Sequence, residues 1–192
     1  MTTTARLRID RIVDPGGRRI VGRTFSEARV RRSVSRILES NVLCSISTVT
    51  KGNQAHINTA YFCYSGNLDV YFLSDPHSFH GRNLSTNASA AMAIFDPSQT
   101  WGRPDRGIQL YGTCKEARGR TATKAGRLYG ERFSVYQKWM AGRNEEEKRL
   151  AAQLRTYRFY RFVARKVKIL DEREFGGGVF VIAFVRRARE SK

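Results

Sequence analysis

The sequence contains no long apolar run, and none lies at its beginning. No segment approaches the ~20 consecutive apolar residues that a membrane-spanning helix needs. The opening residues, Met1-Thr-Thr-Thr-Ala-Arg, lack the apolar stretch of a secretory signal peptide. We therefore expect a cytoplasmic protein that does not bind a membrane.

Cysteine is scarce, and its spacing is uninformative for metal or redox chemistry. The three cysteines, Cys44, Cys63 and Cys114, are odd in number, and no two have a C-x-x-C spacing. Each lies among residues typical of strands. The pattern favours buried free thiols, with a disulfide or a metal site as the alternatives, and we expect no metal site.

Acidic residues are also scarce relative to basic ones. The chain has 35 Lys and Arg against 17 Asp and Glu, which gives a formal net charge of +18. Such a charge attracts polyanions, so a basic nucleic-acid-binding module is one possible function. The basic residues are dispersed, however, and no zinc-finger, homeodomain or RRM pattern accompanies them. We therefore expect a solvated basic surface, with some arginines binding a phosphorylated small molecule, and no specific nucleic-acid binding.

The apolar residues that are present suffice for a folded core. Hydrophobic residues make up 41% and aromatic residues 11% of the 192 positions. This composition and length predict one domain over residues 1–192, with a core at about 30–185. Residues 1–24 read as an N-terminal hairpin or arm, because apolar residues flank the turn signal Asp14-Pro15-Gly16-Gly17.

Periodicity predicts a mainly β protein with a few helices. A helix is expected after the candidate N-cap Ser26, because Val30, Val34, Ile37 and Leu38 form one apolar stripe. The remaining pattern predicts strands and further helices. The expected strands are 42–49, 55–64, 68–74, 88–95, 107–117, 157–170 and 179–185, with helices at 78–85, around 128–140 and after Asn144. The first three of these strands form a meander, and the whole pattern favours a small barrel.

The segment Ser74 to Leu84 carries the clearest chemical signal. It follows a strand and opens a helix, where backbone N–H groups are available for an anion. The hydroxyl of Ser78 and the cationic groups of His80 and Arg82 add the donors that a phosphate monoester prefers. The alternative is an ordinary N-capped helix with a polar face.

Six segments, by their order and spacing together, resemble the pyridoxamine-phosphate-oxidase-like flavoprotein family. The segment 78–84 is similar to the family's Ser-x-Lys/His-x-x-Asn-Leu at a helix start. Upstream, 56–62 resembles the family's strand beside the flavin and is followed by 70–74. Downstream, 106–112 resembles its arginine- and glutamine-bearing strand that ends in a glycine, and 157–159 and 170–176 resemble its barrel-closing strands. The resemblance covers about residues 30–185. It implies a split β-barrel with peripheral helices, bound flavin mononucleotide (FMN) and a homodimer.

The resemblance also implies binding roles for individual residues. Ser78 and His80 match the family's phosphate-binding Ser-x-Lys, with a histidine in place of the usual lysine. The other matched cofactor-binding positions are Asn58, Thr59 and Ala60 at the ring edge, Leu73 and Ser74 beside the ribityl chain, Arg82 and Asn83 after the phosphate motif, and Arg106 and Gln109 on a later strand.

These expectations lead to an FMN-dependent oxidoreductase that acts on a small organic substrate. No residue stands out as a general acid or base. The arginine-rich C-terminal signature of the true vitamin-B6 oxidases is missing, so we do not expect pyridoxamine phosphate as substrate. The alternatives are a non-catalytic protein that binds flavin, deazaflavin or haem, with His56, His77 or His80 as possible haem or metal ligands. Trp101 is expected to pack in a core or interface, or to cover the ring.

Overall fold

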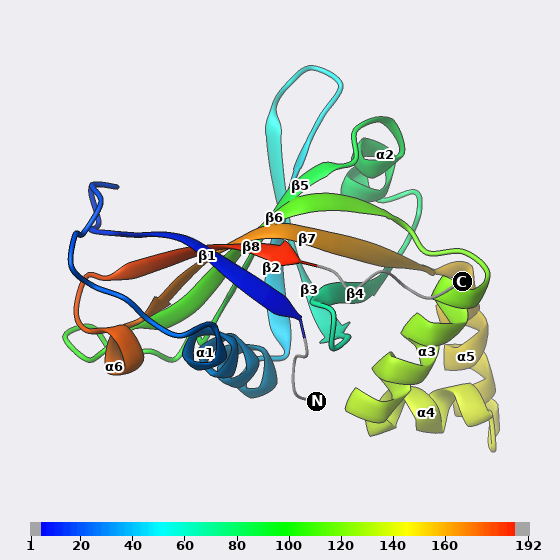
Figure 1. The fold of residues 1–192 in the computed structure, drawn as a ribbon. Helices are drawn as coiled ribbons and strands as arrows, with labels where there is room; N and C mark the ends of the chain where they lie inside the picture. Colours follow the sequence, from blue (N-terminus) through cyan, green and yellow to red (C-terminus); the bar gives the residue numbers. More distant parts are fainter. Residues whose placement is uncertain (1–4, 187–192) are drawn as a thin grey trace.

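A computed structural model describes residues 5–186 and contains a closed six-stranded antiparallel barrel (Figure 1). The order around the barrel is β7-β4-β3-β2-β5-β6, and a β6–β7 pairing closes it. Its strands are β2 (Leu43–Val49), β3 (Ala55–Tyr64), β4 (Asp69–Ser74), β5 (Ser89–Phe95), β6 (Arg106–Glu116) and β7 (Arg158–Asp171). The expectation of a mainly β split barrel with peripheral helices is confirmed.

Two further strands extend the barrel into a wider sheet. The first half of β7 pairs with β4, and its second half pairs with β8 (Phe180–Arg186), which in turn pairs with β1 (Arg6–Val13). The turn after β1 forms as expected, with the N–H of Gly17 donating to the carbonyl of Asp14 at 3.0 Å. The expected returning strand is reduced to one bridge, Val13 to Arg19, with a backbone hydrogen bond from the N–H of Ile20 to the carbonyl of Ile12.

The helices lie outside the barrel, and α1 (Glu27–Ser40) closes one side of the core. Ser26 caps α1 as expected, because its Oγ accepts from the N–H of Arg29 at 3.3 Å. The predicted apolar stripe of α1 is fully buried against strands of the barrel and its extension. The other helices are α2 (Phe79–Thr86), α3 (Arg120–Arg132), α4 (Ser134–Ala141), α5 (Glu145–Thr156) and α6 (Glu172–Phe175). Helices α3, α4 and α5 gather at one end of the molecule (Figure 1).

The barrel interior is filled by aromatic and branched side chains, among them Phe62, Phe72 and Phe162. All three cysteines are buried and free, which confirms the sequence prediction. Burial raises the pKa of the Cys44 and Cys63 thiols to about 12, so both are protonated and unreactive at neutral pH. Within residues 5–186, no helix is long and apolar enough to cross a membrane.

Candidate functional site

The site begins where β4 ends and the chain turns into α2. Ser78 is the N-cap of α2: its Oγ accepts from the N–H of Gly81 at 3.2 Å and donates to the carbonyl of Asp75 at 2.6 Å. Gly81 lies so close to the preceding loop that an added Cβ would be 2.5 Å from the carbonyl oxygen of Pro76. The start of α2 is therefore held rigidly against the end of β4.

His80 points back from α2 toward the end of β4. Its Nε2 lies 2.6 Å from Oγ of Ser74 and 3.0 Å from Oγ of Ser78. The side chain is only 8% exposed, and burial lowers the pKa of His80, with His56 adding to this effect and Asp75 opposing it. His80 is therefore neutral at neutral pH, and its ring nitrogen is poised between two hydroxyl groups.

His56 of β3 completes a small cluster of rings at this position. Its ring stacks on Phe79 with centroids 5.7 Å apart and lies 6.4 Å from the ring of His80 at an interplanar angle of 22°. Nδ1 of His56 is buried and has no hydrogen-bond partner in the described part of the chain. A buried polar atom without a partner is costly, so this atom marks a position where a ligand would be favourable.

Arg82 lies on the exposed side of the same cluster. Its guanidinium stacks over the ring of Phe79 at 4.7 Å and donates to the backbone carbonyl of His77. The structure thus brings Ser78, His80 and Arg82 together around the start of α2, as the sequence predicted. These groups are the donors and cations that a phosphate monoester needs.

An unpaired strand edge lies next to the start of α2. The register that pairs Phe62 with Phe72 would next place Tyr61 opposite Leu73 and then Ala60 opposite Ser74, but the pairing of β3 with β4 ends at Phe62. Within residues 5–186, no strand pairs with the β4-side edge of β3 at residues 55–61, whereas β2 pairs with its other edge. In this register the backbone groups of Asn58 and Ala60 pair with β2, so of these three residues it is Thr59 whose backbone N–H and C=O face the gap without a ladder partner.

The side chains of these three β3 residues differ in their surroundings. The side chain of Thr59 is exposed, while that of Asn58 is half-buried with a buried Oδ1 that has no hydrogen-bond partner among the described residues. The carbonyl of Ala60 is approached by the Cys44 thiol at 3.4 Å. The partly unsatisfied edge of β3 is the second element of the candidate site.

Two other predicted residues have structural contacts beside the site. Nδ2 of Asn83 donates to Oγ1 of Thr48 at 3.0 Å in the interior, which anchors α2 to β2. Leu73 pairs with Phe159 of β7. Leu73 and the neighbouring Ser74 are both half-buried at the end of β4. The sequence did not identify Thr48 as a partner, since nothing local links β2 to α2.

Arg106 and Gln109 lie apart from this cluster within one chain. The end of β6 near α2 is at Cys114, whose N–H donates to the carbonyl of Ala88. Arg106 is eight residues earlier, which is about 26 Å along a strand. Its Nε is 3.3 Å from Oδ1 of the fully buried Asp171, so the arginine compensates a buried charge there. Gln109 is exposed on the outer face and accepts from the hydroxyl of Tyr111 at 2.8 Å.

The remaining candidates are placed as follows. His77 is exposed, and within residues 5–186 no group of three or more His, Cys, Asp or Glu side chains is positioned to hold a metal ion. Trp101, in the loop between β5 and β6, is 99% exposed and packs in no core of this chain.

Comparison with protein families assigns this arrangement of strands and helices. The family model described as pyridoxamine 5′-phosphate oxidase matches residues 30–168, which include β2 to β6, α2 and β7 as far as Lys168. The chain belongs to this family. This match confirms the family resemblance that was identified from the sequence. A comparison with curated protein sequences finds no match.

Solved structures with the same fold include proteins of different kinds. A haem-binding protein from Mycobacterium smegmatis has a TM-score of 0.62 at 15% identity, and the match covers 84% of this chain and 59% of that one. HutZ of Vibrio cholerae, described as a haem storage protein, has a TM-score of 0.56 at 13% identity, covering 80% and 94%. A putative pyridoxamine 5′-phosphate oxidase from Listeria innocua has a TM-score of 0.55 at 14% identity, covering 72% and 96%. At these identities the likeness concerns the fold alone.

Proposed function

We propose that this member of the pyridoxamine 5′-phosphate oxidase family binds FMN and is an oxidoreductase for a small organic substrate. The observation that carries the proposal is the open edge of β3 beside the capped start of α2. The edge offers backbone groups to a flat polar ring, and the helix start offers a hydroxyl, imidazoles and a guanidinium to a phosphate. One molecule that has both a polar ring edge and a terminal phosphate is FMN.

The residues of the site take separate roles in this proposal. Ser78, His80, Arg82 and the N–H groups at the start of α2 bind the phosphate, with His56 beside them. The backbone N–H and C=O of Thr59, between Asn58 and Ala60, orient the ring, and Leu73 and Ser74 lie along the ribityl chain. Asn83 holds α2 in place through Thr48. When bound, the flavin supplies the electron-pair or hydride chemistry, and the protein supplies binding, orientation and electrostatics.

A homodimer is part of the proposal. Several large apolar side chains are exposed on the outer face of the barrel: Leu43 is 37%, Ile57 68%, Tyr61 56% and Phe95 47% exposed. Grouped exposed apolar residues are typical of interaction sites, and a second copy is the partner proposed here. Because Arg106 and Gln109 lie far from α2 in one chain, they reach a flavin site only if a second copy brings them there.

The test of the proposal is a comparison of FMN with riboflavin. The purified protein reconstituted with FMN is expected to show the two visible bands of an oxidised flavin. His80→Ala and Arg82→Ala are each expected to weaken FMN binding by about one to two orders of magnitude, because a charge-assisted hydrogen bond contributes roughly 1.5–3 kcal/mol. Riboflavin lacks the phosphate, so its weaker binding is expected to stay nearly constant.

A matched control separates a phosphate contact from a general loss of charge. Arg149, an exposed arginine on α5, lies outside every element assigned to the proposed site, and Arg149→Ala is expected to leave both affinities unchanged. Equal losses for FMN and riboflavin in the His80 and Arg82 variants would show that the phosphate does not bind at the start of α2. Failure to bind any flavin would remove the proposal.

Haem binding is the second candidate, and the unpartnered Nδ1 of His56 is the observation that favours it. A neutral imidazole nitrogen is a common iron ligand, and two proteins with this fold bind or store haem. Titration with hemin distinguishes the two candidates. A single intense Soret band that His56→Ala abolishes, together with no flavin binding, would replace FMN by haem.

A further inference from the structure

A row of alternating cationic and aromatic side chains crosses four strands on the outer face of the sheet. In the strand register, Arg8 of β1 lies opposite Phe184 of β8, Phe184 opposite Lys166 of β7, and Lys166 opposite Tyr111 of β6. The Arg8 guanidinium is 5.1 Å from the centroid of the Phe184 ring, and the Lys166 ammonium is 4.5 Å from that of Tyr111. The four side chains therefore form one continuous cross-strand ladder.

A second row lies beside the first and has the same charge. Arg11 of β1, Ile182 of β8, Lys168 of β7 and Gln109 of β6 are cross-strand neighbours. The Lys168 ammonium lies 4.2 Å from the centroid of the Phe180 ring. Neighbouring strands are about 4.8 Å apart, so each row spans roughly 14 Å. Together the two rows, here called the β1–β6 ladder, present four cations on a twisted surface.

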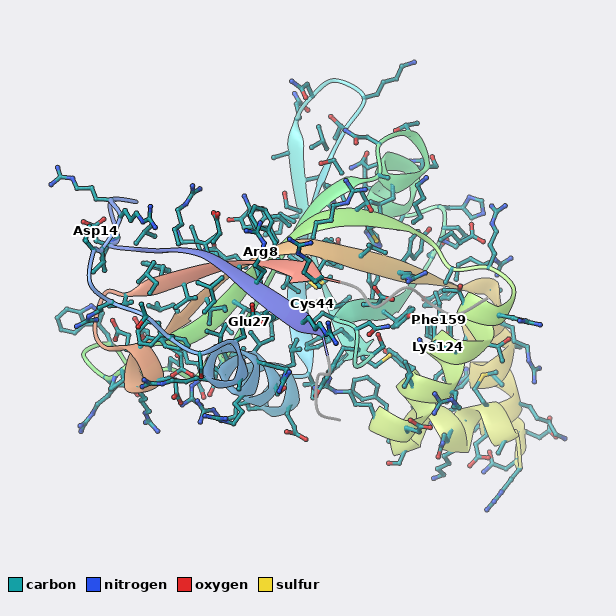
Figure 2. All side chains as sticks on the ribbon, viewed as in Figure 1. Arg8, Asp14, Glu27, Cys44, Lys124 and Phe159 are labelled. Atoms are coloured by element: carbon teal, nitrogen blue, oxygen red, sulfur yellow. The ribbon has the colours of Figure 1, made fainter. Side chains whose placement is uncertain are left out.

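The β1–β6 ladder faces away from the core. The alternate residues of the same strands, such as Leu7, Val181 and Val167, are buried on the opposite face with the apolar stripe of α1. In Figure 2, Arg8 and Glu27 of α1 lie on opposite sides of β1. Exposed Arg6, Arg18 and Arg19 flank the ladder, and the nearby acidic residues are Asp10 and Asp14, of which Asp10 pairs with Arg11 at 3.7 Å.

We infer that the β1–β6 ladder binds single-stranded nucleic acid without sequence preference. Lysine and arginine at regular spacing neutralise successive phosphates, and aromatic side chains between them offer contacts to unpaired bases. A sheet face that combines both features is a recurrent surface for single strands. A duplex offers phosphates but no free bases, so the aromatic members of the ladder would have no role with it. The net charge of +18 supplies the long-range attraction.

Two other occupants fit the surface less well. A second copy of this chain would bring like charges together across a two-fold axis, which is unfavourable. A membrane surface would use the lysines but needs inserted apolar side chains, and the ladder's aromatic side chains are half-buried in the sheet. The ladder shares no residue with the start of α2, and Gln109 at its β6 end is the one member that the proposed flavin site would also use.

The test compares charge reversals at two places. Lys166→Glu/Lys168→Glu removes two cations of the ladder, whereas Arg149→Glu/Arg155→Glu makes the same charge change on α5 at the other end of the molecule (Figure 1). Binding of a fluorescein-labelled oligothymidylate of about 15 nucleotides is followed by anisotropy at several salt concentrations. The ladder variant is expected to bind at least about tenfold more weakly. The slope of the logarithm of its affinity against the logarithm of salt concentration is expected to be smaller by about 0.7 for each phosphate that it no longer neutralises. The α5 variant is expected to bind like the wild type.

A third variant tests the aromatic part of the inference at constant charge. Tyr111→Leu is expected to weaken oligothymidylate binding several-fold and to leave binding of inorganic polyphosphate unchanged, because polyphosphate has no bases. If Tyr111→Leu changes the binding of neither ligand, the surface binds polyanions in general and the assignment to single-stranded nucleic acid is wrong.

Folding and assembly are checked on the same proteins. Thermal melts establish that the variants are folded. If the glutamate substitutions unfold the sheet, the two charge-reversal variants are replaced by their glutamine counterparts, Lys166→Gln/Lys168→Gln and Arg149→Gln/Arg155→Gln. Equal weakening in the ladder and α5 variants would overturn the inference, since net charge alone would then explain binding. It would also be overturned if the ladder variant changed the oligomeric state, or if duplex DNA or vesicles containing phosphatidylserine bound more tightly than oligothymidylate.

Discussion

At the scale of single residues, His80 joins the chemistry of the site to the stability of the fold. Burial holds its pKa below the ordinary value, so the folded state favours the neutral imidazole. A group with a lowered basic pKa contributes stability that is present above its unfolded pKa of ~6.5 and is lost as the pH falls toward its folded pKa. The two serine hydroxyls at Nε2 are compatible with this neutral state.

We therefore expect a pH-dependent difference between the wild type and His80→Gln. The free energy of unfolding of the wild type is expected to fall more steeply than that of His80→Gln as the pH is lowered from 8 toward 5, about the unfolded histidine pKa of ~6.5. Urea denaturation at each pH measures this slope. The exposed His77 provides the control, since His77→Gln is expected to keep the wild-type slope. Parallel curves for wild type and His80→Gln would contradict this expectation.

A bound phosphate is expected to raise the pKa of His80, whereas burial lowers it. A phosphate dianion next to His80 favours the protonated ring, so FMN affinity is expected to decrease as the pH rises through the pKa of the complex. His80→Lys carries a fixed charge at neutral pH and is expected to flatten this dependence. Fluorescence titration of FMN between about pH 5.5 and 8.5, a range centred near the ordinary histidine pKa, measures both proteins. An unchanged pH profile in His80→Lys would show that His80 is not the titrating group.

At the scale of elements, the closing pair β6–β7 depends on one glycine. A Cβ built on Gly112 would lie 2.0 Å from the carbonyl oxygen of Val163, and the register of the two strands shifts between Tyr111 and Gly112. Gly112→Ala is expected to lower the free energy of unfolding by about 1–3 kcal/mol or more, as overpacking does in a rigid interior. Gly52→Ala, whose nearest neighbour is the Thr50 hydroxyl at 3.8 Å, is the matched control and is expected to have a small effect. Urea denaturation curves that coincide for both variants would contradict this.

Local pattern predicted the elements better than their partners. Period-two alternation and turn residues placed β2 to β8 within about two residues, and the capping serines located α1 and α2. The pairing of β1 with β8 was not predicted, because it joins residues about 170 positions apart and no local signal encodes it. The break between α3 and α4 at Phe133 and the short helix α6 were also missed.

For the site, local sequence and resemblance contributed different parts. Ser78, His80 and Arg82 followed from their position at a helix start, whereas the β3 residues came only from the family resemblance. The unpaired edge of β3 could not be predicted, because it results from the early separation of β3 from β4. The cations of the ladder were visible as alternating Lys166 and Lys168, but their aromatic partners come from other strands.

At the scale of the whole molecule, the cations and one group of exposed apolar side chains meet on a continuous outer face. The cations of the ladder lie on β1 and β7, the exposed apolar Leu43, Ile57, Tyr61 and Phe95 lie on β2, β3 and β5, and Phe95 lines the same hollow as Lys168 and Phe180. The cationic part suits a polyanion and the apolar part suits a second copy of the chain.

The exposed apolar face of β2 and β3 can be tested as the dimer interface. The chain is expected to elute as a dimer of about twice 21.9 kDa, with the outer face of β2 and β3 buried between the copies. Ile57, which is 68% exposed on β3, is a suitable position, and Ile57→Glu would place a charge in the interface without disturbing the core. This variant is expected to elute as a monomer and to bind FMN at least tenfold more weakly, because burying an unpaired charge is costly and the second copy completes the proposed site. Val135→Glu makes the same kind of change at a 53% exposed position on α4 and is expected to remain dimeric. A wild-type monomer that binds FMN tightly would show that one chain forms the whole site and that the apolar face of β2 and β3 has another purpose.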